Sequence, residues 1–266
     1  MNAHEIDYHI YGDDIQFVEI ELDPQEAVIA EPGSMMYKPS SIEMDTILGD
    51  GSKQQGGVFD SLLSAGKRLL TGEGIFLTSY WNKGFKKERV AFAATIPGKI
   101  IPLDLSLYQG KVVLQKESFL CAAKGVSVDL EFRKKLGVGL LGGEGFIMQK
   151  LTGDGWAFAH AGGAIIRKEL NNEALEVDTG CLVGFAGNIN YDITWVKGIK
   201  NMLFSGEGIS LAHLSGNGTV WLQSLPFSRL ADRIISAAPK MGGSRRGEGS
   251  IMGGLGDILM GDQRDR

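Results

Sequence analysis

Three of the four Gly-Glu-Gly tripeptides in this chain constrain what it can fold into more than any other feature of its sequence. They occupy residues 72–74, 143–145 and 206–208. A short apolar run follows each copy, then a turn-forming glycine ten residues after the tripeptide, then a second apolar run; these glycines are Gly84, Gly155 and Gly218. Apolar runs joined by such turns are typical of β-hairpins. The sequence therefore predicts three equivalent hairpins, with a positive φ angle at each turn glycine.

The repeated pattern extends upstream of each tripeptide. An acidic residue precedes a short apolar stretch three times, at Glu31, Glu117 and Asp178. A repeat of this size buries too little apolar surface to fold alone, so we expect three repeats to pack around a common pseudo-three-fold axis. The predicted fold class is all-β, with three tandem β-sandwich-like repeats. Their expected bounds are about 26–105, 113–170 and 175–228.

The last part of the chain differs in composition from the rest. The chain has 38 glycines among 266 residues, and residues 239–266 combine many of them with mixed charges and isolated apolar clusters. A segment without strand alternation or helical periodicity buries little surface. We therefore expect one all-β body, residues 1–238, followed by a flexible glycine-rich tail, residues 239–266.

Composition and charge exclude several classes of function. The formal net charge of −5 disfavours a generic nucleic-acid binder. The two cysteines, Cys121 and Cys181, are too few for a disulfide framework, and no Cys or His spacing indicates a metal site. The chain has no phosphate-binding GxxxxGK[ST] loop, no signal-peptide pattern and no apolar run long enough to span a membrane. We expect a cytoplasmic protein that binds no nucleic acid, metal or cofactor.

Four stretches of the chain carry a resemblance to a known family. They read AEPGSMMY, GGVFDSLLSAGKRLLTGEGIFLTSY, LGGEGFIMQKLTGDGWAFAHAGG and FSGEGISLAHLSGNGTVWLQSLP. Together they resemble the family named for altered inheritance of mitochondria, over residues ~1 to ~235. The resemblance implies a repeated β-sandwich unit similar to the trp RNA-binding attenuation protein, arranged with three-fold pseudo-symmetry. It implies no catalytic residue and no cofactor. The mitochondrial members are linked to inner-membrane organisation, and this chain looks like a bacterial cytoplasmic member.

Two sets of polar residues are candidate sites. A pseudo-three-fold axis would bring Glu73, Glu144 and Glu207 together as oxygen ligands for a hard cation, although each also fits an ordinary turn residue. His160 and His213 each suit a general base if a pocket lies beside them. The alternative for both is a hydrogen-bonded structural histidine, because neither has a second ligand at metal spacing.

The connection before each tripeptide mixes bulky apolar residues with positive charge, on a chain that is otherwise acidic. If the repeats are related by three-fold symmetry, these segments emerge on one face, which suits an anionic membrane surface or another copy of the protein. The alternative is that the apolar residues pack between repeats and that the Lys and Arg stems cover them. This basic-apolar face is defined by Phe59, Leu62, Lys67, Arg68, Arg133, Lys134, Lys135, Trp195, Lys197 and Lys200.

These observations predict a non-enzymatic, self-associating β-scaffold. Its basic-apolar face would bind a protein partner or an anionic membrane surface, with the protein cytoplasmic and peripherally associated at the inner membrane face. The alternative is a small-ligand-binding protein or an enzyme with a pocket between repeats. A buried cleft with His160 or His213 near a glutamate would favour this alternative.

Overall fold

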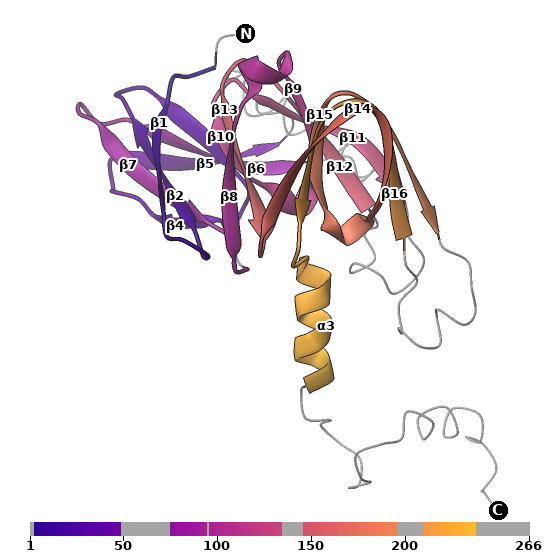
Figure 1. Cartoon of the computed structure of the whole chain (residues 1–266). Helices are drawn as coiled ribbons and strands as arrows, with labels where there is room; N and C mark the ends of the chain where they lie inside the picture. Colours follow the sequence, from indigo (N-terminus) through magenta and orange to yellow (C-terminus); the bar gives the residue numbers. More distant parts are fainter. Residues whose placement is uncertain (1–2, 49–74, 95, 135–145, 196–209, 238–266) are drawn as a thin grey trace, which may run out of the picture. The chain divides into compact units, whose positions relative to one another are not determined.

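The computed structural model describes residues 3–48, 75–94, 96–134, 146–195 and 210–237 (Figure 1). The chain divides into a compact unit, Met1–Ala231, and a second unit, Asp232–Arg266. The structure is nearly all-β, as the sequence predicts. The predicted tail, residues 239–266, lies outside the described residues. In the part of the chain that the structure describes, no helix is long and apolar enough to cross a membrane.

The described strands form one four-stranded and two six-stranded sheets. The four-stranded sheet has the order β1 (Asp7–Tyr11), β2 (Phe17–Leu22), β7 (Glu88–Ala93), β4 (Met35–Tyr37). The first six-stranded sheet has the order β5 (Ile42–Leu48), β6 (Phe76–Asn82), β3 (Ala27–Ala30), β10 (Phe119–Ala123), β13 (Trp156–Gly162), β8 (Gly98–Asp104). The second has the order β11 (Ser127–Lys134), β12 (Phe146–Thr152), β9 (Lys111–Gln115), β15 (Leu182–Trp195), β16 (Ser210–Gln223), β14 (Ile165–Asp178). The helical elements among the described residues are the short 3-10 helices η1 (Leu105–Tyr108), η2 (Lys116–Ser118) and η4 (Thr179–Cys181), and the α-helix α3 (Phe227–Ala237).

The same pairing order occurs in three consecutive groups of strands. In the first group, β7 lies between β2 and β4, and β6 lies between β3 and β5. The second group repeats this order with β8-β13-β10 and β9-β12-β11. In the third group the two halves of β14, β16 and β15 take these places, because each strand runs for 14 residues. Three copies of one sandwich unit would give this pairing; the pseudo-three-fold axis stays a prediction.

The predicted hairpins are wrong in how their strands connect. β6 and β7 flank the turn at Gly84 but belong to different sheets, and the same holds for β12 and β13 around Gly155. Both turns therefore carry the chain from one sheet to another. At Gly218 there is no turn, because β16 continues through it. The corresponding antiparallel hairpins of the three groups are instead β5–β6, β11–β12 and β15–β16, one strand earlier in the chain.

The predicted positive φ is also wrong at two of the three glycines. Gly84 and Gly155 lie outside the left-handed region, and Gly218, with a φ of 159°, is close to extended backbone. Close packing explains the choice of glycine at position 155. A Cβ atom there would lie 2.4 Å from the Cβ atom of Ala3, far inside van der Waals contact.

The main core is built on aromatic residues at corresponding positions of the three groups. Phe92 on β7, Phe158 on β13 and Trp221 on β16 are all buried in one apolar cluster. The Phe92 ring packs edge-on against Tyr80, with 5.0 Å between ring centroids. Cys121 lies in the same cluster, where burial raises the pKa of its thiol. The groups therefore share a core, as the small size of each repeat requires.

Candidate functional site

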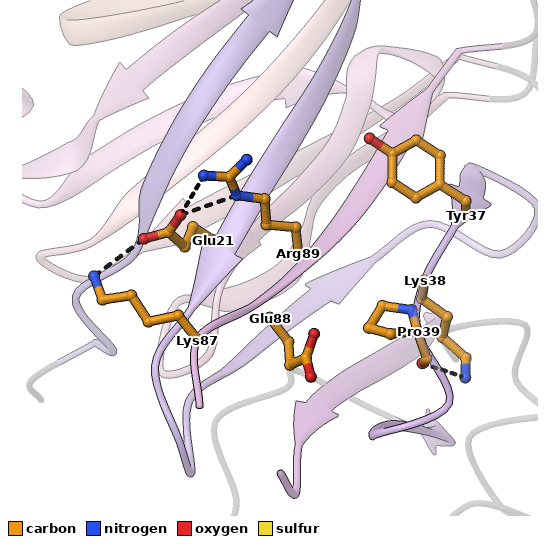
Figure 2. Close-up of a pocket in the computed structure, with 7 residues that line it drawn as sticks. All are labelled: Glu21, Tyr37, Lys38, Pro39, Lys87, Glu88 and Arg89. Atoms are coloured by element: carbon orange, nitrogen blue, oxygen red, sulfur yellow. Dashed lines mark hydrogen bonds and ion pairs between the residues drawn. The ribbon is translucent and has the colours of Figure 1, made fainter. Parts of the chain in front are cut away.

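A shallow hollow of about 530 Å³ lies over β2, β7 and the segment after β4 (Figure 2). Its charged side chains bind each other. Glu21 forms an ion pair with Lys87 at 3.1 Å and another with Arg89 at 2.8 Å. These partners lower the pKa of the Glu21 carboxyl. Lys38 donates from Nζ to the Ile42 carbonyl at 2.7 Å. This arrangement is typical of an ion-paired sheet surface.

A second cavity, of about 320 Å³, lies where segments from all three strand groups meet. Its walls are largely apolar, and a few polar side chains converge on it, as in many small-molecule sites. The lining residues are Glu31, Pro32, Gly33, Ser34, Ala93, Ala94, Ile96, Glu117, Phe119, Leu120, His160, Gln223 and Phe227.

A tight turn holds Glu31 at the cavity. The backbone nitrogen of Ser34 donates to the Glu31 carbonyl at 3.2 Å, and the Ser34 hydroxyl donates to the same oxygen at 2.7 Å. Pro32 and the following Gly33, whose φ is 89°, fit the two central positions of a type II turn. The backbone nitrogen of Glu31 also donates to the Leu120 carbonyl at 3.0 Å. The sequence Glu-Pro-Gly-Ser therefore fixes the Glu31 backbone beside the second group of strands.

His160 and Glu31 have shifted pKa values for the same physical reason. His160 lies on β13 and is only 4% exposed, so burial lowers its pKa to about 4, although a hydrogen bond with the backbone of Ile96 opposes this shift. Burial raises the pKa of Glu31 to about 7; Lys116 opposes that shift and the negative charge of Glu117 adds to it. At neutral pH the cavity therefore has a neutral imidazole and a carboxyl group close to half ionisation. These groups suit hydrogen bonding to a small polar ligand.

The structure places only part of the predicted acidic and histidine site. His160 lines the cavity, whereas His213 lies on β16, 3.1 Å from Glu176 and bonded to Thr194. Glu73, Glu144 and Glu207 lie outside the described residues. Within the described ranges, no group of three or more His, Cys, Asp or Glu side chains is placed to hold a metal ion.

The basic-apolar face also lies largely outside the described residues. Backbone positions are described for three of its members, at the ends of β11 and β15: Arg133, Lys134 and Trp195. The other seven members fall in the undescribed connections: Phe59, Leu62, Lys67, Arg68, Lys135, Lys197 and Lys200. The exposure of this face therefore stays a prediction.

Sequence reasoning found Glu31 and Glu117 only as markers of the repeat. They recur with Asp178 before corresponding strands, and the structure brings the first two to the cavity. Asp178 instead caps η4, accepting from the Gly180 backbone nitrogen at 2.9 Å, and pairs with Arg229 at 3.0 Å. The recurrence was the available signal, but it did not indicate which copies face a cavity.

Comparisons with known proteins agree with this architecture. Residues 8–225 match the model of the family described as mitochondrial biogenesis AIM24. The chain belongs to this AIM24 family. An uncharacterized protein of Streptococcus pyogenes serotype M6 is 29% identical over 224 residues, which cover 84% of this chain and 86% of that protein. The AIM24 fold is also seen in a crystal structure of a Streptococcus pyogenes protein, with a TM-score of 0.69 and 23% identity, covering 88% of this chain and 100% of that one.

Proposed function

We propose that this AIM24 protein is a non-enzymatic, self-associating β-scaffold whose basic-apolar face binds an anionic membrane surface. The observation that carries the proposal is the position of the three basic-apolar segments. In the chain, each lies between the two strands of a corresponding hairpin, β5–β6, β11–β12 or β15–β16. The last residue pairs of these hairpins are Leu48 with Phe76, Lys134 with Phe146, and Trp195 with Ser210.

The common placement of the three segments supports joint action at a surface. Each segment contains two or three cations and at least one bulky apolar residue. Near an anionic membrane a Lys or Arg contributes about 1 kcal/mol, and inserted apolar side chains add to this. Seven such cations at corresponding hairpin ends would give a binding energy that no single segment provides. The proposal places the protein peripherally at the inner membrane face.

Vesicle co-sedimentation tests this proposal. The full-length protein should bind vesicles containing anionic lipid more strongly than vesicles of neutral phosphatidylcholine, and added salt should weaken the binding. Glutamine at all seven cations should abolish binding and leave the melting temperature nearly unchanged; the positions are Lys67, Arg68, Arg133, Lys134, Lys135, Lys197 and Lys200.

A control with as many replaced cations as one segment tests whether vesicle binding depends on this face. Glutamine at three exposed cations elsewhere, Lys86, Lys87 and Lys99, should leave vesicle binding intact. Equal binding to both kinds of vesicle would overturn the membrane proposal. A large fall in melting temperature of the seven-position variant would show that the segments pack between repeats.

A second candidate function is the binding of a small molecule in the 320 Å³ cavity. The convergence of His160, Glu31 and Glu117 on apolar walls favours it. Native mass spectrometry of protein isolated directly from cells should show a retained small molecule. The cavity-filling change Ala94→Phe should remove that mass. A wild-type mass equal to that of the bare chain would argue against this candidate.

A further inference from the structure

Among the described strands, β14 is an edge strand along its whole length. It is the last strand of the second six-stranded sheet, and its 14 residues pair with β16 on one side. On the other side, none of the described strands pairs with it. An unpaired edge exposes backbone N–H and C=O groups that can bind another strand.

The corresponding strands of the other two groups have protected edges. β1 pairs with the outer edge of β2. Beside β8, Gln16 donates from its backbone nitrogen to the Gly98 carbonyl at 2.9 Å, and its side chain accepts from the Ile100 nitrogen at 2.8 Å. β8 also contains Pro102, which has no N–H to offer. The open edge of β14 is therefore a departure from the pattern of the other two groups.

The charges along β14 are complementary to those of a second copy of β14 that runs antiparallel to it. Cations lie in its first half, at Arg167 and Lys168, and anions dominate its second half, at Glu173, Glu176 and Asp178. Antiparallel pairing of two copies brings each basic half opposite an acidic half. The side chains of Arg167 and Glu176 are 59% and 65% exposed, so their present ion pairs with Glu169 and His213 leave both open to a further partner.

The β-bulge in β14 makes this register possible. Across the β14–β16 ladder, Arg167 lies opposite Trp221 and Glu176 lies opposite His213. Trp221 and His213 are an even number of residues apart, so they face the same side of β16, and their partners share that side of the sheet. Arg167 and Glu176 are an odd number of residues apart, so in a regular strand they would face opposite sides of the sheet. The extra residue of the bulge, Asn172, with its φ of 58°, brings them to the same side.

We propose that a second copy of this chain binds the open edge of β14 by antiparallel β14–β14 pairing, with Arg167 of each copy opposite Glu176 of the other. A two-fold axis perpendicular to the sheet then produces the Arg–Glu pair twice and joins two six-stranded sheets into one. The inference rests on the self-association in the proposed function and specifies the surface that makes it.

Charge reversal with rescue tests this pairing in the full-length protein. Sedimentation velocity over a concentration series should show a dimer. Arg167→Glu alone and Glu176→Arg alone should each weaken it by at least about tenfold, because the two-fold axis places two like-charged pairs directly opposite. The double variant R167E/E176R should restore dimerisation. The control Lys99→Glu, on the protected strand β8, should leave it unchanged.

Amide hydrogen exchange identifies the strand that makes the contact. In the dimer, outward-facing amides of β14 should be protected, and Arg167→Glu should remove that protection without lowering the melting temperature. If a single variant fails to fold, Arg167→Gln and Glu176→Gln provide the same comparison without charge repulsion. A monomeric wild type would overturn both this pairing and self-association. A dimer unaffected by all of these changes would overturn the β14 pairing alone, since self-association would then use another surface.

Discussion

Replacing Gly216 with alanine should lower the free energy of unfolding by about 2 to 4 kcal/mol. Gly216 has a φ of 127°, which an L-residue adopts only with strain of about 1 to 3 kcal/mol. Its new Cβ atom would also lie 2.3 Å from the backbone oxygen of Asn188 on β15. A backbone oxygen held in a sheet moves little, so part of the clash must be relieved by distorting β16. Urea unfolding monitored by circular dichroism measures the loss.

A variant at a second glycine separates the cost of backbone strain from the cost of the steric clash. Gly33 has a φ of 89°, and a Cβ atom there would meet nothing within 4 Å. Gly33→Ala should therefore cost only the backbone strain, about 1 to 2 kcal/mol. Equal losses for the two variants would contradict the close approach of Gly216 on β16 to Asn188 on β15.

Acidification should destabilise the protein through His160, by about 3 kcal/mol between pH 7 and pH 4. The folded-state pKa of about 4 lies below the ordinary value of 6.5, so the unfolded chain binds the proton more tightly. The contribution of neutral His160 to stability is therefore complete above pH 6.5 and is lost as the pH falls towards 4. Each unit of pKa difference corresponds to about 1.4 kcal/mol.

The variant His160→Gln isolates this effect. The difference in unfolding free energy between wild type and variant should shrink by about 3 kcal/mol from pH 7 to pH 4. Glu31 acts in the opposite direction, because its raised pKa of about 7 costs stability as the pH rises from 4.5. Both proteins contain Glu31, so its effect cancels in the difference. A difference that stays constant with pH would show that His160 is not buried as a neutral group.

The sequence was sufficient to predict strands but not the partners of those strands. Strict alternation in β2, where Val18, Ile20 and Leu22 are buried, is visible from the residue types alone. The turns at Gly84 and Gly155 look the same whether they join neighbours in one sheet or carry the chain between sheets. That choice depends on packing between distant segments, such as the pairing of β3 with β10. In the third group the strand continues through the glycines, which local turn signals alone do not reveal.

A pocket between repeats, with His160 or His213 near a glutamate, was the alternative interpretation of the sequence, but its lining could not be predicted, for a related reason. Its walls come from segments as distant in sequence as Glu31, Phe119 and Gln223. Glu31 and His160 carry no motif that distinguishes them from other isolated polar residues. Only the fold shows that both side chains are shielded from water beside the same cavity. The recurring acidic positions were a usable clue to structure, but one copy, Asp178, caps a short helix instead.

The central claim is that three corresponding hairpin ends act together at an anionic surface. The most direct measurement is the affinity for anionic vesicles after glutamine replacement in one segment at a time: Lys67 and Arg68, then Arg133 to Lys135, then Lys197 and Lys200. At about 1 kcal/mol for each cation, every replaced cation should weaken binding about fivefold, so all three variants lose affinity and the combined variant does not bind. Loss confined to a single segment, with full affinity after replacement of the other two, would contradict the account.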